Sequence, residues 1–114
     1  IFTYEKQENF YALYLDTKSK LISFKLLFKG TLNSSTVHPR EVFKYAFLES
    51  AASVVVIHNH PSGDVSPSIQ DIEVTESLMK IGSIVKIPVI DHIIIGKDKY
   101  YSFYEYMNTL KNKL

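Results

Sequence analysis

Apolar and polar residues are grouped in blocks that predict a hairpin near the start of the chain. Residues 10–15 are aromatic and aliphatic, residues 16–20 are polar and turn-prone, and residues 21–28 are again mostly apolar. Two such runs joined by a short polar connection are typical of paired antiparallel strands. A polar loop is expected next, at residues 30–36.

A first helix is predicted after this loop. Pro39 suits the first helical turn, because its fixed φ matches a helix and its missing N–H would have no helical partner there. We expect the helix to reach about residue 50 and to bury one apolar stripe, made of Val42, Phe43, Ala46 and Phe47.

The middle of the chain combines a strand with a second helix. Residues 53–57 form a short β-branched run, as expected of a strand buried on both faces. The helix should start at Ser68, because this hydroxyl stands three residues before the acid Asp71, the spacing of an N-terminal capping box. Gly82 is the candidate for its C-terminal cap.

Three further strands are predicted toward the C-terminus, at residues 84–89, 90–95 and 100–103. Pro88 favours an edge or a bulge between the first two. Residues 102–105 are suited to cap a terminal helix. Strands and helices alternate in the middle while hairpins flank them, which gives an α/β or α+β class with a mixed sheet packed by helices.

Length and composition agree with one globular domain. The chain has 114 residues, of which 46% are hydrophobic and 22% charged, enough to build a single core. It begins at Ile1 rather than Met, so we expect a single domain over residues 1–114 that was taken from a longer protein.

Charge and residue usage exclude several classes of function. The 13 basic and 12 acidic residues are scattered, so there is little electrostatic case for binding nucleic acid through its phosphates. Cysteine is absent, which excludes thiolate nucleophiles and Cys-ligated zinc. No apolar run approaches the roughly 20 residues of a membrane span, and the N-terminus lacks a signal-peptide layout. We expect a cytoplasmic protein without a membrane partner.

Two histidines directly follow the predicted buried strand. In HNHPSGDVSPSIQD, residues 58–71, His58 and His60 are two positions apart. Side chains two apart in a strand leave the same face, so both imidazoles can converge on one point. The prolines and the glycine that follow predict a stiff turn, which can bring the start of the next helix back to that point.

Asp71 lies in the first turn of this next helix. Two histidines and a carboxylate leave a coordination position for water, which is typical of a catalytic rather than a structural zinc site. Zinc lowers the pKa of bound water to about 7 and polarises a carbonyl. Ser68, on the same side of the helix start, is placed to stabilise the resulting oxyanion.

Each part of this pattern also has a structural explanation. An isolated His-x-His at a strand end is more often structural than metal-binding, and Ser68 with Asp71 alone is explained by a capping box. The whole pattern HxHx(7)SxxD, after a buried strand and before a helix, is far more specific. It favours a metal site.

The chain resembles the bacterial RadC proteins, also called the UPF0758 family, whose motif is that of the JAMM/MPN (JAB) metalloproteases. Nearly the whole chain takes part in the resemblance, including LYLD at 13–16, GTLN at 30–33, HPREVF at 38–43, HNHPSG at 58–63 and DHIIIG at 91–96. The resemblance implies an α/β fold of the cytidine-deaminase-like JAB/MPN type. It also implies that His58, His60 and Asp71 bind Zn²⁺ and that Ser68 assists at the oxyanion.

The same resemblance implies a general base, a glutamate at the head of an early strand. Glu8 is our choice, because it immediately precedes the strand at residues 10–15. Glu41 is the alternative, although an acid in the first helical turn after Pro39 is also explained by the helix dipole.

The expected function is a zinc-dependent peptidase or isopeptidase that uses water to attack an amide carbonyl of a peptide or protein substrate. One alternative is a DNA repair or recombination accessory module, which the family's name suggests. Another is an interaction module that keeps the metal, because several MPN relatives lack activity. A cytidine deaminase is excluded, because its zinc site needs cysteines.

The other two histidines have structural explanations. His38 is expected in a loop or at the start of the helix that follows Pro39. Asp91 and His92 are expected to form a hydrogen-bonded pair rather than a second metal site.

Overall fold

The sheet begins with the predicted hairpin. In the computed structural model, which describes residues 7–30 and 37–113, β1 (Glu8–Leu15) and β2 (Leu21–Gly30) pair antiparallel. Residues 31–36 of the predicted polar loop lie outside the described part of the chain.

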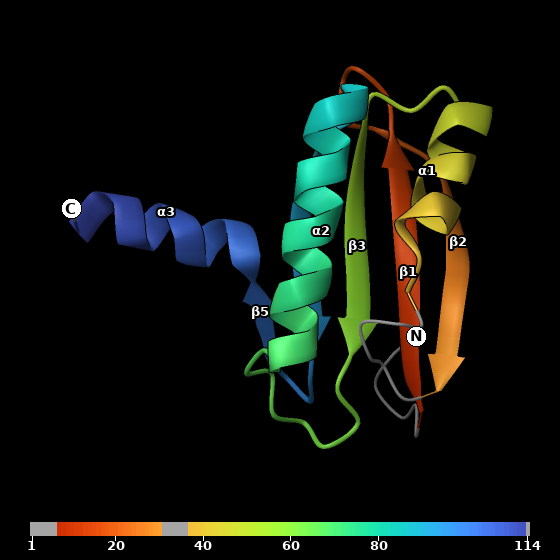
Figure 1. Cartoon of the computed structure of the whole chain (residues 1–114). Coiled ribbons are helices and arrows are strands. Elements are labelled where there is room, and N and C mark those ends of the chain that lie inside the picture. The colour runs from red at the N-terminus through yellow and green to blue at the C-terminus, as the bar shows by residue number, and fades with distance from the viewer. Residues whose placement is uncertain (1–6, 31–36, 114) are drawn as a thin grey trace.

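Three more strands complete a mixed sheet with the order β2-β1-β3-β4-β5 (Figure 1). β3 (Ser53–Asn59) pairs antiparallel with β1 and parallel with β4 (Val89–Ile95). β5 (Tyr100–Ser102) pairs antiparallel with β4. The parallel pair needs a crossover, which α2 (Ile69–Val85) supplies. The α/β class with a mixed sheet is confirmed.

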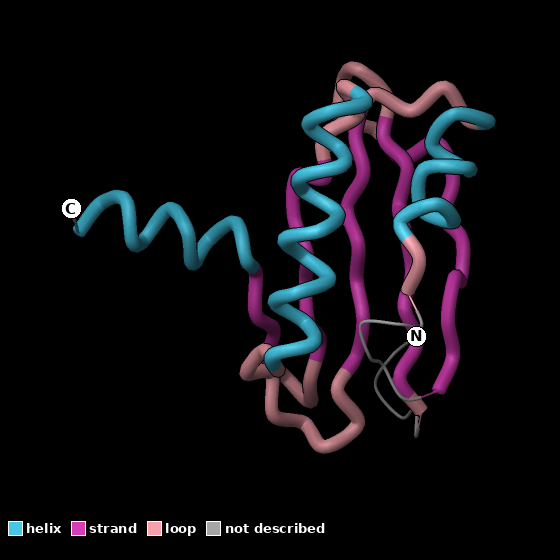
Figure 2. The backbone as a smooth tube through the Cα atoms, in the orientation of Figure 1, coloured by secondary structure: helices cyan, strands magenta, loops and turns pink. Residues whose placement is uncertain are grey.

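Two helices cover the same face of this sheet. α1 (Pro39–Leu48) lies in front of β1, and α2 lies in front of β3 and β4 (Figures 1 and 2). The terminal helix α3 (Phe103–Lys113) extends away from the sheet. Among the described residues, no helix combines the length and apolar composition that crossing a membrane requires.

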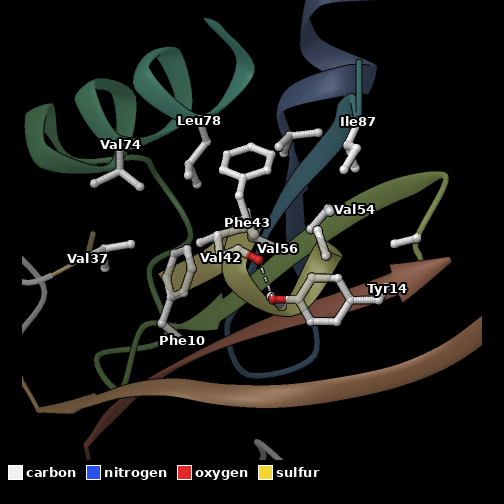
Figure 3. Close-up of a cluster of buried hydrophobic side chains, with 14 residues drawn as sticks. Phe10, Tyr14, Val37, Val42, Phe43, Val54, Val56, Val74, Leu78 and Ile87 are labelled. Atoms are coloured by element: carbon white, nitrogen blue, oxygen red, sulfur yellow. Dashed lines mark hydrogen bonds between the residues drawn. The ribbon is translucent and has the colours of Figure 1, made fainter. Parts of the chain in front are cut away.

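The core lies between the sheet and these two helices (Figure 3). Phe10 and Tyr14 of β1 are buried there, and the Tyr14 hydroxyl donates a 2.7 Å hydrogen bond to the Val42 carbonyl of α1. The predicted stripe of α1 is wrong at one position, because Phe47 is 58% exposed while Val42, Phe43 and Ala46 are buried. Phe47 directly follows the buried Ala46 in the last turn of α1 and lies outside the buried face of the helix.

The connection from α2 to β4 differs from the prediction. The helix continues to Val85, so the strand predicted at residues 84–89 is absent and β4 begins only at Val89; the left-handed cap is Lys86 with φ 62°. Gly82 lies inside the helix and its carbonyl accepts a hydrogen bond from Ile87. A Cβ at Gly82 would lie 2.7 Å from the Ile87 carbonyl oxygen. Glycine is therefore required at position 82 because the backbone of residues 87–89 passes close to the helix there, and not because the helix ends there.

Three segments meet at one end of the sheet, the lower end in Figure 1. β3 ends there, β1 begins there, and α2 starts there. Glu8, His58, His60, Ser68 and Asp71 lie on or directly beside these three segments, whereas Glu41 lies on α1.

Candidate metal centre

His58, His60 and Asp71 are brought together at this end of the sheet. His58 Nε2 lies 3.1 Å from Asp71 Oδ1, and His60 Nε2 lies 3.1 Å from Asp71 Oδ2. One nitrogen or oxygen of each residue lies within 4.8 Å of the others, a group that could hold a metal ion. His58 and Asp71 are almost completely buried, whereas the His60 side chain is 13% exposed. The predicted convergence of the two imidazoles on Asp71 is confirmed.

The turn between β3 and α2 sets this geometry. His60 follows the last residue of β3, and its N–H donates to the Ile95 carbonyl at the end of β4. The Gly63 N–H then donates to the His60 carbonyl, and Gly63 has φ +88°, a conformation that other residues rarely adopt. The chain thus reverses and places Asp71 in the first turn of α2, facing the histidines.

Asp71 is held as a carboxylate. Burial alone would raise its pKa, but the imidazoles of His58 and His60 and the N–H of Ser68 hold the pKa well below its ordinary value. The Ser68 N–H lies 2.8 Å from Asp71 Oδ2. The buried negative charge is therefore oriented by three groups, with Oδ1 toward His58 and Oδ2 toward His60.

The proton position on His60 follows from its partners. His60 Nδ1 lies 2.7 Å from the Asp64 carbonyl, which can only accept, so Nδ1 carries a hydrogen. In the neutral ring, Nε2 then directs its lone pair toward Asp71. When Nε2 is protonated it donates to the Asp71 carboxylate, and this hydrogen bond raises the pKa of His60; the Asp64 carbonyl and the charges of Asp71 and Glu8 act in the same direction, and burial opposes them.

His58 Nε2 is buried and lies 3.1 Å from Asp71 Oδ1, but it makes no well-aligned hydrogen bond with that oxygen or with any other described residue. An unpaired buried nitrogen is costly, and a cation beside it and the Asp71 carboxylate would remove that cost. Imidazole nitrogen and carboxylate oxygen are both zinc ligands, and three protein ligands are usual in catalytic sites. The donor set therefore fits a metal ion.

His92 contacts the site from the neighbouring strand β4. Its Nε2 lies 2.7 Å from His58 Nδ1, and its Nδ1 is hydrogen-bonded to the Thr75 hydroxyl of α2. His92 is fully buried, and this burial, with the adjacent His58, lowers its pKa to about 3. The register of β3 against β4 brings the two rings together, and local sequence patterns do not predict which strands pair.

Asp91 and His92 are hydrogen-bonded to each other, as predicted, but through the His92 backbone N–H and not through its ring. The Asp91 carboxylate accepts hydrogen bonds from the Ser102 hydroxyl and from the N–H groups of His92 and Tyr104. The His92 ring points to the other side of the strand, because adjacent residues alternate faces. Asp91 therefore secures the start of α3, while His92 belongs to the candidate site.

Ser68 is the N-cap of α2, as predicted, and forms a complete capping box with Asp71. Its Oγ accepts a 3.0 Å hydrogen bond from the Asp71 N–H. The Ser68 residue is exposed, next to the buried carboxylate. Its hydroxyl hydrogen is not used by the cap, which leaves Ser68 able to donate to a substrate.

Glu8 and Glu41 lie on different elements, Glu8 at the start of β1 and Glu41 in the first turn of α1. Phe10 is paired with His58, and its ring stacks on the His58 ring at 5.9 Å. Glu8 is two residues earlier on β1 and so has its side chain on the same face. Its charge acts on His60, whereas the charge of Glu41 acts on Tyr14, which is paired with Val54. Glu8 is thus at the correct end of the sheet, and its catalytic role stays a prediction.

His38 is separate from the cluster. It is the exposed N-cap residue of α1 and makes no side-chain cap hydrogen bond, in agreement with its expected place at a helix start.

Comparison with known proteins gives one consistent result. The sequence model of the RadC-like JAB domain matches residues 1–109. UPF0758 proteins of Bacillus cereus strain AH187, Bacillus anthracis strain A0248 and Bacillus thuringiensis subsp. konkukian strain 97-27 are each 56% identical over 100 residues. The alignments cover 88% of this chain and 44% of each relative, so the chain spans less than half the length of these relatives.

The match covers most of the chain, including His58, His60 and Asp71. It agrees with the mixed sheet and its helices. The chain therefore belongs to the family of RadC-like JAB domains.

Proposed function

We propose that this domain is a zinc-dependent hydrolase of amide bonds, a peptidase or an isopeptidase. The observation that carries the proposal is the buried cluster of His58, His60 and Asp71, whose ligand atoms lie within 4.8 Å of one another. These three residues would hold the ion. When bound, zinc lowers the pKa of water and polarises a carbonyl, which is the chemistry that hydrolysis of an amide needs.

The chain's own residues supply the remaining steps. Glu8 takes the proton from the attacking water and delivers it to the leaving amine, since a carboxylate at the edge of the site can act first as base and then as acid. Ser68 donates its hydroxyl hydrogen to the developing oxyanion, because its cap hydrogen bond uses only the oxygen. The substrate is a peptide or a protein, because it must present an amide carbonyl to a site that is open at His60 and Ser68.

Metal analysis of the purified domain tests this proposal. We expect one zinc per chain in the wild type and none in His58→Ala/His60→Ala, with His38→Ala as the matched control, because His38 is an exposed histidine outside the cluster. Full zinc retention in the double variant would exclude this site. Iron in place of zinc would point to oxygen chemistry, for which two histidines and one carboxylate are also suited.

Activity is tested by screening peptide and isopeptide substrates with and without a chelator. We expect cleavage that the chelator abolishes and added zinc restores. Cleavage that is equal in wild type and the double histidine variant would identify a contaminating protease and contradict the proposal.

A further inference from the structure

A chain of hydrogen bonds leads from His58 back to the helix that carries Asp71. The Thr75 hydroxyl donates to the Asp71 carbonyl at 2.7 Å, and this uses the one hydrogen that the hydroxyl has. His92 Nδ1 is hydrogen-bonded to the same oxygen. Because Thr75 has no second hydrogen, His92 Nδ1 must be the donor.

The proton on His92 Nδ1 decides the tautomer of His58. His92 is completely buried between aromatic rings, with Phe103 stacked on it at 5.0 Å and Phe10 meeting it at 5.8 Å. A fully buried imidazole without a carboxylate partner is neutral, so His92 Nε2 is an acceptor. His58 Nδ1, 2.7 Å away, must then carry a hydrogen and donate it to His92. The lone pair of His58 is left on Nε2, which faces Asp71.

We propose that Thr75 and His92 are positioning residues, which hold His58 in the tautomer that can bind a metal ion. The proposal rests on the metal site proposed above, and it concerns how this chain prepares one ligand. Asp71 and Thr75 are four residues apart on α2, so the same helix supplies one ligand and anchors the tautomer of another. His92 of β4 links Thr75 on α2 to His58 on β3 through one hydrogen bond to each, forming a relay.

His58 and His60 thus have the same tautomer, with the hydrogen on Nδ1 and the lone pair on Nε2, but different groups fix it. The Asp64 carbonyl fixes the hydrogen on His60 Nδ1, and the Thr75–His92 pair fixes it on His58 Nδ1. Partners that orient ligating histidines in this way set metal affinity, and their loss typically costs about 10–100-fold. His58 is more deeply buried than His60. Its Nδ1 is hydrogen-bonded to the His92 ring, whereas the Nδ1 of His60 is hydrogen-bonded to a backbone carbonyl.

Thr75→Val is the decisive variant, because it keeps the shape of the buried side chain and removes only its hydroxyl. The matched controls are Thr75→Ser, which restores the hydroxyl, and Leu78→Val, which weakens packing of the same helix outside the relay. The two readouts are the imidazole tautomers from ¹⁵N NMR and the zinc dissociation constant from competition with a chromophoric chelator.

In the wild type we expect His92 to carry its proton on Nδ1, with or without zinc. In Thr75→Val we expect this preference to be lost and zinc binding to weaken about 10–100-fold, with Thr75→Ser near the wild type and Leu78→Val unchanged in affinity. A wild-type His92 protonated on Nε2 would overturn the proposal. So would a Thr75→Val zinc affinity equal to that of the wild type.

A second variant guards against a folding failure of Thr75→Val. His92→Phe keeps an aromatic ring in the same buried position but cannot accept from His58, and it should lower zinc affinity to a similar extent. Unchanged affinity in folded His92→Phe would contradict the relay. If the wild type binds no zinc at all, the proposed function fails, while the His92 tautomer in the metal-free chain still decides whether the relay exists.

Discussion

Ser68 and Asp71 cap each other at the start of α2. Ser68 Oγ accepts from the Asp71 N–H at 3.0 Å, and Asp71 Oδ2 accepts from the Ser68 N–H at 2.8 Å. The same carboxylate oxygen lies 3.1 Å from His60 Nε2. The capping explanation of this pair is therefore correct and is compatible with the proposed metal site, because the group that starts the helix is also held against the two histidines.

Replacing Ser68 with Ala should therefore destabilise the metal-free domain by about 1 kcal/mol, the usual cost of losing an N-cap. Urea unfolding in the presence of a chelator measures this change. Ser68→Thr keeps an N-cap hydroxyl and should restore most of the stability. Ser83→Ala, an exposed serine in the same helix, is the control and should be neutral or slightly stabilising. Equal stability of Ser68→Ala and the wild type would show that the cap contributes nothing.

The two candidate bases can be separated by one pair of variants. Glu8→Gln should keep stoichiometric zinc and lower the cleavage rate about 10²–10⁴-fold, the range expected when a general base is removed. Glu41→Gln should leave both unchanged, because Glu41 is in the first turn of α1 and its charge acts on Tyr14 rather than on the histidines. Rates are compared on a substrate found in the peptide screen. The opposite result would transfer the role of base to Glu41.

The sequence predicted the candidate site well because local rules determine most of it. Strand periodicity places His58 and His60 on one face, and the capping pattern places Asp71 in the first helical turn. Both rules act within a few residues, and the structure agrees with both. The contact of His92 with His58 depends instead on the pairing of β3 with β4, which joins positions 34 residues apart.

The wrong predictions share this cause. Gly82 was expected to end a helix, because glycine is the usual residue there. Its true role depends on Ile87 and Val89, which pass so close that a Cβ would meet backbone atoms at 2.7 and 3.1 Å. Helical spacing predicts Phe47 in the core, but Phe47 is exposed next to the buried Ala46, so α1 buries a narrower stripe than its sequence predicts.

Gly82→Ala tests this interpretation, because the expected sign is the reverse of the usual one. Alanine in place of glycine in a helix normally stabilises by about 1 kcal/mol. Here the added methyl group collides with the backbone of the segment that leads into β4, and overpacking of this kind costs about 1–3 kcal/mol. Chemical denaturation should show a loss of stability in Gly82→Ala. A gain of stability would mean that the chain at Ile87 can move aside.

Tyr14 should make the stability of the domain sensitive to alkaline pH. Its buried hydroxyl donates to the Val42 carbonyl, and burial, with the charges of Tyr45, Glu49 and Glu41, raises its pKa far above the ordinary value of 10.0. A group whose pKa is raised on folding contributes stability that is complete below its unfolded pKa and is lost as the pH rises above it. This contribution should therefore be complete below pH 10 and decline at higher pH.

The comparison of wild type with Tyr14→Phe isolates this effect from the titration of lysines and exposed tyrosines. At pH 7 the variant should be less stable by about 1 kcal/mol, because it lacks the hydrogen bond to Val42. Above pH 10 the difference should shrink and then reverse, because the folded wild type keeps the Tyr14 phenol protonated while the unfolded chain ionises, and the variant has no such group. Urea unfolding at several pH values between 7 and 12 measures the difference. A constant difference over that range would mean that the Tyr14 hydroxyl ionises equally in the folded and unfolded chains.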